Sequence, residues 1–87
     1  MVWVILIYDI EKSRVNKIRK ICEGYLVRVQ ESAFEGYISA ALLNILIKRL
    51  KKEIDESYDK IKIYSFREDR KGKIIELGDV SHKDNII

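Results

Sequence analysis

The sequence has one cysteine, one histidine and no proline among its 87 residues. A single cysteine cannot form an internal disulfide, and no Cys/His spacing typical of zinc occurs, which excludes disulfide scaffolds and zinc fingers. Cys22 falls on the apolar stripe of a predicted helix, which favours a small buried hydrophobe over a nucleophile. His82 stands far along the chain from the other candidate residues, so catalysis by a pair of histidines is not expected.

Long hydrophobic stretches are also absent. The longest, Val2 to Tyr8, has about seven residues against the roughly 20 of a membrane-spanning helix, and it starts too early for a secretory signal. We therefore expect a cytoplasmic protein without a membrane partner. The sequence contains no phosphate-binding glycine loop and no dinucleotide fingerprint, and it lacks the RNP1 pattern, which disfavours an RNA-recognition domain.

The composition is that of one small globular domain: 47% of the residues are hydrophobic, 36% are charged, and the net charge is +3. A chain of this length buries only about 60% of its unfolded surface, so association into an oligomer is a reasonable expectation. The mildly basic balance permits a nucleic-acid partner without requiring one.

Hydrophobic periodicity predicts a β-α-β-β-α-β order with one further strand. The strands are expected at Val2–Tyr8, Leu26–Gln30, Ser32–Ile38, Lys60–Phe66 and Lys73–Leu77, with a bulge at Gly36. The helices are expected from an N-cap at Ser13 to about Glu23, where Gly24 ends the first, and from an N-cap at Ser39 to a point before Asp55. Right-handed β-α-β connections in this order predict an α+β, ferredoxin-like sandwich with both helices on one face of the sheet.

The first strand is apolar on both alternating faces, although the chain provides cover for only one of them. A second copy of the chain is the simplest cover for the other face, so we expect a homodimer. We divide the chain into a domain of residues 1–78 and a tail of residues 79–87. The tail ends in apolar residues and is expected to pair with a sheet edge of the partner subunit.

Asp9 directly follows the apolar strand, where its carboxylate would lie at the rim of the sheet. There it could hold Mg²⁺, which needs only one or two protein carboxylates beside water and phosphate. Alternatively, Asp9 only opens the turn into the next helix. Six cations against two acids between Glu11 and Gln30 form a basic stripe that suits phosphate backbones, although such a helix face can also be merely solvated.

Three segments together resemble the second CRISPR-associated protein family (Cas-two). They are Tyr8-Asp9-Ile10, the basic helix Arg14–Ile21 and, most specifically, the run Arg28-Val-Gln-Glu-Ser-Ala-Phe-Glu-Gly36. The resemblance continues through Lys62-Ile-Tyr64, Leu77-Gly78 and the closing Asn85-Ile-Ile87. It implies a ferredoxin-like homodimer that joins the CRISPR integrase (Cas-one) in capturing new spacer DNA for antiviral defence.

The resemblance also implies a Mg²⁺-dependent endonuclease acting on single-stranded RNA or on double-stranded DNA. Asp9 matches the family's metal-binding aspartate, and three further positions match residues linked to activity: Tyr8, Arg28 and Phe34. The cations expected to bind nucleic acid are Arg14, Lys17, Arg19, Lys20 and Arg28, although the helix positions match the family only loosely. Ala33 replaces the family's usual valine, a change in packing that does not affect the metal site.

Two functional hypotheses therefore stand side by side. In the first, the dimer is an enzyme in which Asp9 from each subunit holds Mg²⁺ while Arg28 and the helix cations position the strand. In the second, the dimer is a non-catalytic scaffold that aligns nucleic acid for the integrase. The enzyme requires a metal-dependent rate, whereas the binding affinity of a scaffold would survive chelation of the metal.

Overall fold

A computed structural model describes residues 1–67 and 72–78 of the chain. The strands are β1 (Val2–Asp9), β2 (Val27–Gln30), β3 (Ala33–Ile38), β4 (Lys60–Phe66) and β5 (Lys73–Gly78). The helices are α1 (Lys12–Glu23) and α2 (Ala40–Glu53). The predicted order of elements and the predicted α+β class are confirmed, with strand and helix ends shifted by one or two residues.

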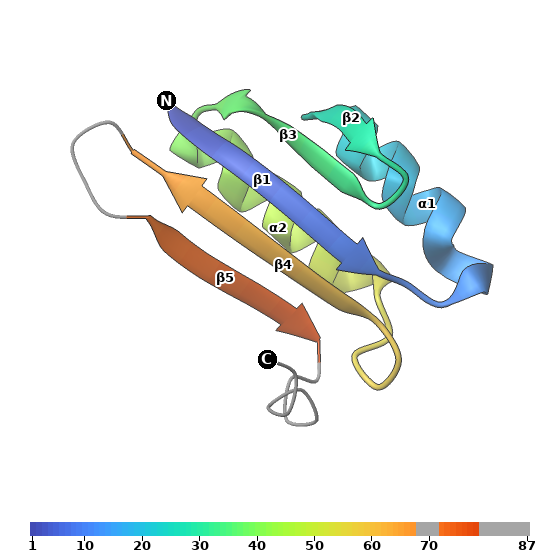
Figure 1. The fold of residues 1–87 in the computed structure, drawn as a ribbon. Helices are drawn as coiled ribbons and strands as arrows, with labels where there is room; N and C mark the ends of the chain where they lie inside the picture. The colour runs from blue at the N-terminus through green and yellow to red at the C-terminus, as the bar shows by residue number, and fades with distance from the viewer. Residues whose placement is uncertain (68–71, 79–87) are drawn as a thin grey trace.

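The five strands form one antiparallel sheet in the order β2-β3-β1-β4-β5. Both helices lie behind this sheet, as Figure 1 shows, and β1 runs through its centre. The first four strands with the two helices make the ferredoxin-like arrangement, and β5 extends the sheet beyond β4. The expected tail pairing concerns residues 79–87, which lie outside the described part of the chain.

The core lies between the sheet and the helices because one face of β1 alternates into it. Val4 and Leu6 are fully buried there and contribute to a cluster with residues of both helices, including Ile18 and Leu46. The predicted apolar stripe of α2 is confirmed, since Leu43, Leu46 and Leu50 are its buried residues. No described helix is long and apolar enough to span a bilayer.

Two local predictions are wrong. Helix α1 is capped by Glu11 instead of Ser13, because the Glu11 carboxylate accepts hydrogen bonds from the Ser13 N–H (3.0 Å) and hydroxyl (2.6 Å). The bulge lies in β2 between Arg28 and Gln30, whereas Gly36 pairs in register with Val4. The predicted cap at Ser39 is confirmed, since its hydroxyl accepts the N–H of Leu42.

The second face of the sheet is apolar and has no cover from the described residues. Trp3, Ile5 and Ile7 of β1 alternate onto it, and Ile7 keeps 43% of its surface exposed. Tyr37 of β3 packs edge-on against Trp3 with 4.8 Å between ring centroids and is 63% exposed. Figure 1 views the sheet from this side. We call it the open face.

Candidate functional site

Asp9 is the last residue of β1 and is exposed at the end of the central strand. Because side chains alternate along a strand, it belongs to the open face with Ile5 and Ile7. Lys60 lies opposite it on β4. Within residues 1–67 and 72–78, no ion pair or side-chain hydrogen bond engages the Asp9 carboxylate. Its oxygens are therefore available to a ligand.

Two acids in the segments that adjoin this end of β1, Glu11 and Asp59, are already engaged. Glu11 caps α1, and the hydrogen bonds from Ser13 hold the pKa of its carboxyl below the ordinary value. Asp59, just before β4, is fully buried and accepts four hydrogen bonds. Asp9 is therefore the one carboxylate among these three that has no internal partner in the described structure.

Asp59 ties the start of α1 to the segment before β4. Its oxygens accept the N–H of Glu11 at 2.8 Å, the N–H of Asp55 at 2.8 Å, and two N–H groups of Arg14 at 2.6 and 3.0 Å. Burial alone would raise the pKa of the Asp59 carboxyl, but these hydrogen bonds and the charge of Arg14 outweigh it, and the pKa is lowered. The loop that follows Asp9 is thereby fixed.

Gly78 closes the same end of the sheet. It pairs with Lys60 and has a φ of +100°, and a Cβ built on it would overlap the backbone oxygen of Asp59. Both the backbone conformation and the close approach therefore require glycine at this position.

Tyr8, Arg28 and Phe34 come together around the turn between β2 and β3. The Tyr8 hydroxyl donates to the Glu31 carbonyl at 3.3 Å, and Arg28 donates to the carbonyls of Glu31 at 3.0 Å and Gln30 at 3.3 Å. Phe34 stacks on Tyr8 with 6.0 Å between ring centroids. All three belong to the helix-covered face, so the structure separates this cluster from the side chain of Asp9.

These contacts suggest different roles for the three residues. Phe34 is fully buried and contributes packing beneath the turn. Burial raises the pKa of the Tyr8 hydroxyl, which therefore stays protonated and acts as a donor. Arg28 is exposed and uses only part of its five N–H donors on the turn, so its guanidinium can still reach a phosphate.

The predicted basic stripe on α1 divides into engaged and available cations. Arg14 binds Asp59, Lys17 pairs with Glu53 at 3.3 Å, and Arg19 pairs with Glu23 at 3.1 Å. Lys12 and Lys20 are exposed and form no ion pair with any described residue. With Arg28, these two lysines are the cations of this region best able to contact a nucleic-acid backbone.

Cys22 belongs to the buried side of α1, as its place in the apolar stripe predicted. Burial raises the pKa of its thiol to about 12, so it remains a thiol at neutral pH and is not a nucleophile.

The donor set at Asp9 fits a hard divalent cation of the Mg²⁺ type. A carboxylate oxygen is the preferred protein ligand, and Mg²⁺ keeps several waters and takes further ligands from phosphate. No group of three or more histidine, cysteine or acidic side chains occurs in the described residues, which disfavours a closed all-protein metal cage. A single exposed carboxylate instead matches an open site completed by substrate.

Sequence reasoning missed Asp59. It follows a polar segment, Asp55-Glu-Ser-Tyr, and nothing in its spacing links it to Arg14, 45 residues earlier. The sequence offers one weak signal, namely that Asp59 directly precedes a strand of alternating residues. An ordinary turn residue also suits that position.

Comparison with known proteins shows that the chain is similar to one protein family. The profile of the family CRISPR associated protein Cas2 matches residues 1–74. A CRISPR-associated endoribonuclease Cas2 from Methanosarcina acetivorans is 40% identical over 76 residues, 87% of this chain and 87% of the relative. A second such endoribonuclease, from Archaeoglobus fulgidus, is 42% identical over 67 residues, 77% of this chain and 73% of the relative.

Solved structures agree with the sequence relatives. A crystal structure of a Cas2 protein is 36% identical, aligns with a TM-score of 0.73 and covers 85% of each chain. The crystal structure of Streptococcus pyogenes Cas2 is 30% identical, aligns with a TM-score of 0.69, and covers 77% of this chain and 88% of its own. The ferredoxin-like prediction therefore agrees with the topology of the sheet and with these solved neighbours.

Proposed function

Because this chain belongs to the CRISPR-associated protein Cas2 family, we propose that it is a homodimeric, Mg²⁺-dependent endonuclease whose first substrate is single-stranded RNA. The observation that carries the proposal is the unengaged carboxylate of Asp9 at the end of the central strand. Curated relatives named endoribonucleases support the reaction class. The protein would work in the cytoplasm, with duplex DNA as a second substrate class.

The dimer would form through the open face. The apolar side chains there need cover, and Ile7, Tyr37, Phe66 and Ile74 are each at least 40% exposed in the single chain. Asp9 belongs to the same face, so a twofold arrangement over it would supply one carboxylate from each subunit. Assembly and the completion of the metal site would thus be one event.

In this proposal the residues of the site have different roles. Bound Mg²⁺ would supply an activated water and neutralise phosphate charge. Asp9 would hold the ion, and Arg28, Lys12 and Lys20 would align the phosphate backbone. Tyr8 and Phe34 would fix the β2–β3 turn and thereby the guanidinium of Arg28.

A second function is favoured by the small number of acids at this end of the sheet. Of Asp9, Glu11 and Asp59, only Asp9 has no internal partner in the described structure, so one chain supplies a single ligand from this group. In this alternative the dimer is a nucleic-acid-binding scaffold for the CRISPR integrase (Cas-one) in the adaptation complex, and its cations matter more than Asp9. Both functions predict binding, but only the first predicts cleavage.

Cleavage assays on single-stranded RNA and duplex DNA, with Mg²⁺ and with EDTA, separate the two. Under the enzyme proposal, Asp9→Asn should lower the Mg²⁺-dependent rate by roughly a hundredfold or more, since it removes the charge that holds the metal. The matched control is Glu56→Gln, an exposed acid in the segment before β4, which should leave the rate unchanged. Cleavage by Asp9→Asn at the wild-type rate contradicts the enzyme proposal, and binding without cleavage by the wild type supports the scaffold.

Variants of two α1 cations test which residues of the basic stripe contact nucleic acid and which stabilise the fold. Lys20→Gln should weaken RNA binding and reduce the slope of log affinity against log salt by about 0.7, with unchanged stability. Arg14→Gln should instead lower the stability, because Arg14 is held by Asp59. The salt dependence of binding and thermal unfolding of both variants provide the readouts, and a salt slope that responds only to Arg14→Gln contradicts this division.

A further inference from the structure

A cavity of about 510 Å³ lies between the beginning of α2 and the β4–β5 side of the sheet. Val2 lines it, and Val2 and Asp9 are opposite ends of β1, roughly 23 Å apart along an extended strand. The cavity is on the helix-covered face, whereas Asp9 belongs to the open face. It is therefore separate from the site proposed above.

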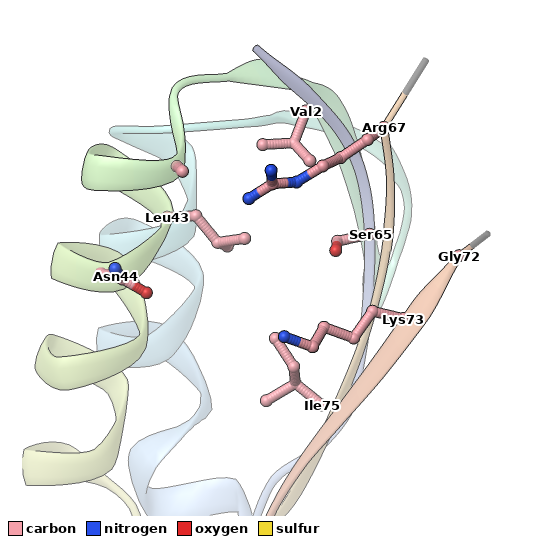
Figure 2. Close-up of a pocket in the computed structure, with 9 residues that line it drawn as sticks. Val2, Leu43, Asn44, Ser65, Arg67, Gly72, Lys73 and Ile75 are labelled. Carbon is pink, nitrogen blue, oxygen red and sulfur yellow. The ribbon is translucent and has the colours of Figure 1, made fainter. Parts of the chain in front are cut away.

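Two cations point into this cavity. Figure 2 shows the guanidinium of Arg67, the residue directly after β4, and the ammonium of Lys73, at the start of β5. Both extend from the sheet side toward α2. Neither forms an ion pair with any residue of the described ranges. No acidic residue is among the described residues that line the cavity. Among the described residues, the lining therefore carries two positive charges and no negative one.

Neutral polar groups and an apolar wall complete the lining. Asn44 of α2 and Ser65 of β4 contribute an amide and a hydroxyl from opposite sides, as Figure 2 shows. Val2, Leu43 and Ile75 provide apolar surface. An apolar wall with a few convergent polar groups is typical of sites for small organic ligands, and the volume lies within the roughly 300–1,000 Å³ of such pockets.

The start of α2 adds to the positive potential. Ala40, the first residue of this 14-residue helix, lines the cavity, and the Ser39 hydroxyl accepts the N–H of Leu42. The N–H groups of the first helical residues have no partner within the helix, and the helix dipole places partial positive charge at this end. An anion bound near Arg67 and Lys73 would be stabilised by this field.

We propose that this cavity binds a nucleoside phosphate monoester, with its phosphate between Arg67 and Lys73 and its nucleoside against Val2, Leu43 and Ile75. A monoester is close to a dianion at neutral pH, which matches the two cations. The ligand is either a free mononucleotide or the phosphorylated terminal nucleotide of a strand. Binding here is independent of the cleavage proposed at Asp9.

Calorimetric titration with 5′-AMP at low salt and in EDTA tests the proposal. We expect adenosine and inorganic phosphate each to bind at least about tenfold more weakly than 5′-AMP, because each lacks one half of the contacts. The double variant Arg67→Gln/Lys73→Gln should weaken 5′-AMP binding by about tenfold or more. The double variant Lys48→Gln/Lys52→Gln removes two exposed cations of α2 outside the cavity and should bind as the wild type does.

Two further comparisons test whether 5′-AMP binds at this cavity and independently of Asp9. Asn44→Glu places a carboxylate at an exposed helix position beside the cavity and should weaken 5′-AMP binding, whereas Asn44→Gln should have little effect. Asp9→Asn should bind 5′-AMP as the wild type does, so that failure of the cleavage proposal and failure of this one remain distinguishable. Equal losses in the two double variants, or equal binding of inorganic phosphate and 5′-AMP, would overturn the proposal.

Oligonucleotides distinguish the two sources of the ligand. If the cavity accepts a strand terminus, a 5′-phosphorylated ten-nucleotide RNA should bind more tightly than its 5′-hydroxyl form, and Arg67→Gln/Lys73→Gln should abolish that difference. If only 5′-AMP responds to the double variant, the ligand is a free mononucleotide. If neither responds, the cavity is not a nucleotide site.

Discussion

The two faces of the central strand have the same chemistry and opposite surroundings. Val4 and Leu6 are fully buried under the helices, whereas their neighbour Ile7 keeps 43% of its surface exposed on the open face. The two helices thus cover one face of the sheet, and the described residues leave the apolar side chains on the other face of β1 without cover. The apolar residues that stabilise the fold differ from those that would drive assembly.

The two aspartates at this end of the sheet differ in the same way. Asp59 is buried, and its carboxylate pairs with Arg14 and accepts hydrogen bonds from two backbone N–H groups. Asp9 belongs to the open face and has no partner in the described part of the chain. An acid satisfied within the chain stabilises the fold, whereas an acid left unsatisfied is available for a metal ion.

The largest expected effect is on the covered face. Leu6→Ala should lower the free energy of unfolding by about 4 kcal/mol, because it removes a fully buried side chain and leaves a cavity. Ile7→Ala, one residue further on, should cost the isolated chain much less. Urea denaturation of both variants over a range of protein concentrations checks this, and equal losses at every concentration would contradict the difference between the faces.

Asp59→Asn should have the next largest effect, a loss of about 2 kcal/mol near neutral pH from weaker bonds to Arg14 and two backbone groups. The pKa of Asp59 in the folded chain lies below its ordinary value of 3.8, so the folded state binds fewer protons than the unfolded state near that pH. The stabilisation is therefore fully present well above the unfolded pKa of 3.8 and is lost as the pH falls through 3.8 toward the folded pKa.

Thermal unfolding of wild type and Asp59→Asn across the acid range measures this effect. The two melting temperatures should converge as the pH falls through that window. A constant difference down to the lowest pH at which both proteins fold would assign the loss to packing instead of charge.

Ile7→Lys should act on assembly. A lysine in the middle of the open face should raise the dimer dissociation constant by about tenfold or more, since it places a charge in the proposed interface. Leu42→Lys is the matched control, because Leu42 is 45% exposed and belongs to α2, a helix on the opposite side of the sheet from the open face. Sedimentation equilibrium gives both constants, and similar weakening by the two variants would place the interface elsewhere.

The smallest expected effect concerns the ion pair between Lys62 and Glu76 on the open face, with 3.3 Å between Nζ and Oε2. Both side chains are at least one-third exposed, so water and salt screen the pair. Lys62→Gln should hardly change the stability of the isolated chain. A loss that appears only at dimer-forming concentrations would indicate that assembly buries the pair.

Local sequence patterns determined most of the fold. The apolar strand β1, the helical stripe of α2 and the serine cap at Ser39 were predicted correctly, because strand-forming runs, helical periodicity and capping act over a few residues. The cap of α1 and the bulge in β2 were misplaced. For the cap, Glu11 and Ser13 both suit the role, and contacts made after folding decide between them. The bulge lies on a different strand from the predicted Gly36, because strand pairing sets its position.

The candidate site was likewise predicted only in part from the sequence. The position of Asp9 at the end of an apolar strand was readable from the sequence, and so was the clustering of cations on α1. Only the tertiary structure showed that Arg14 is held by Asp59, that Phe34 is buried and stacks on Tyr8, and that the Asp9 carboxylate has no internal partner among the described residues.

The physical reason is the range of the interactions. Strand alternation, helix periodicity and charge density are properties of neighbours along the chain, so the sequence alone determined the elements, their order and the excess of apolar surface on β1. The pairing of Asp59 with Arg14 joins residues 45 positions apart, and the cavity between Arg67, Lys73 and α2 joins elements that meet only in the folded sheet. Which charges are neutralised and which remain available was therefore decided by the packing of the helices on one face of the sheet.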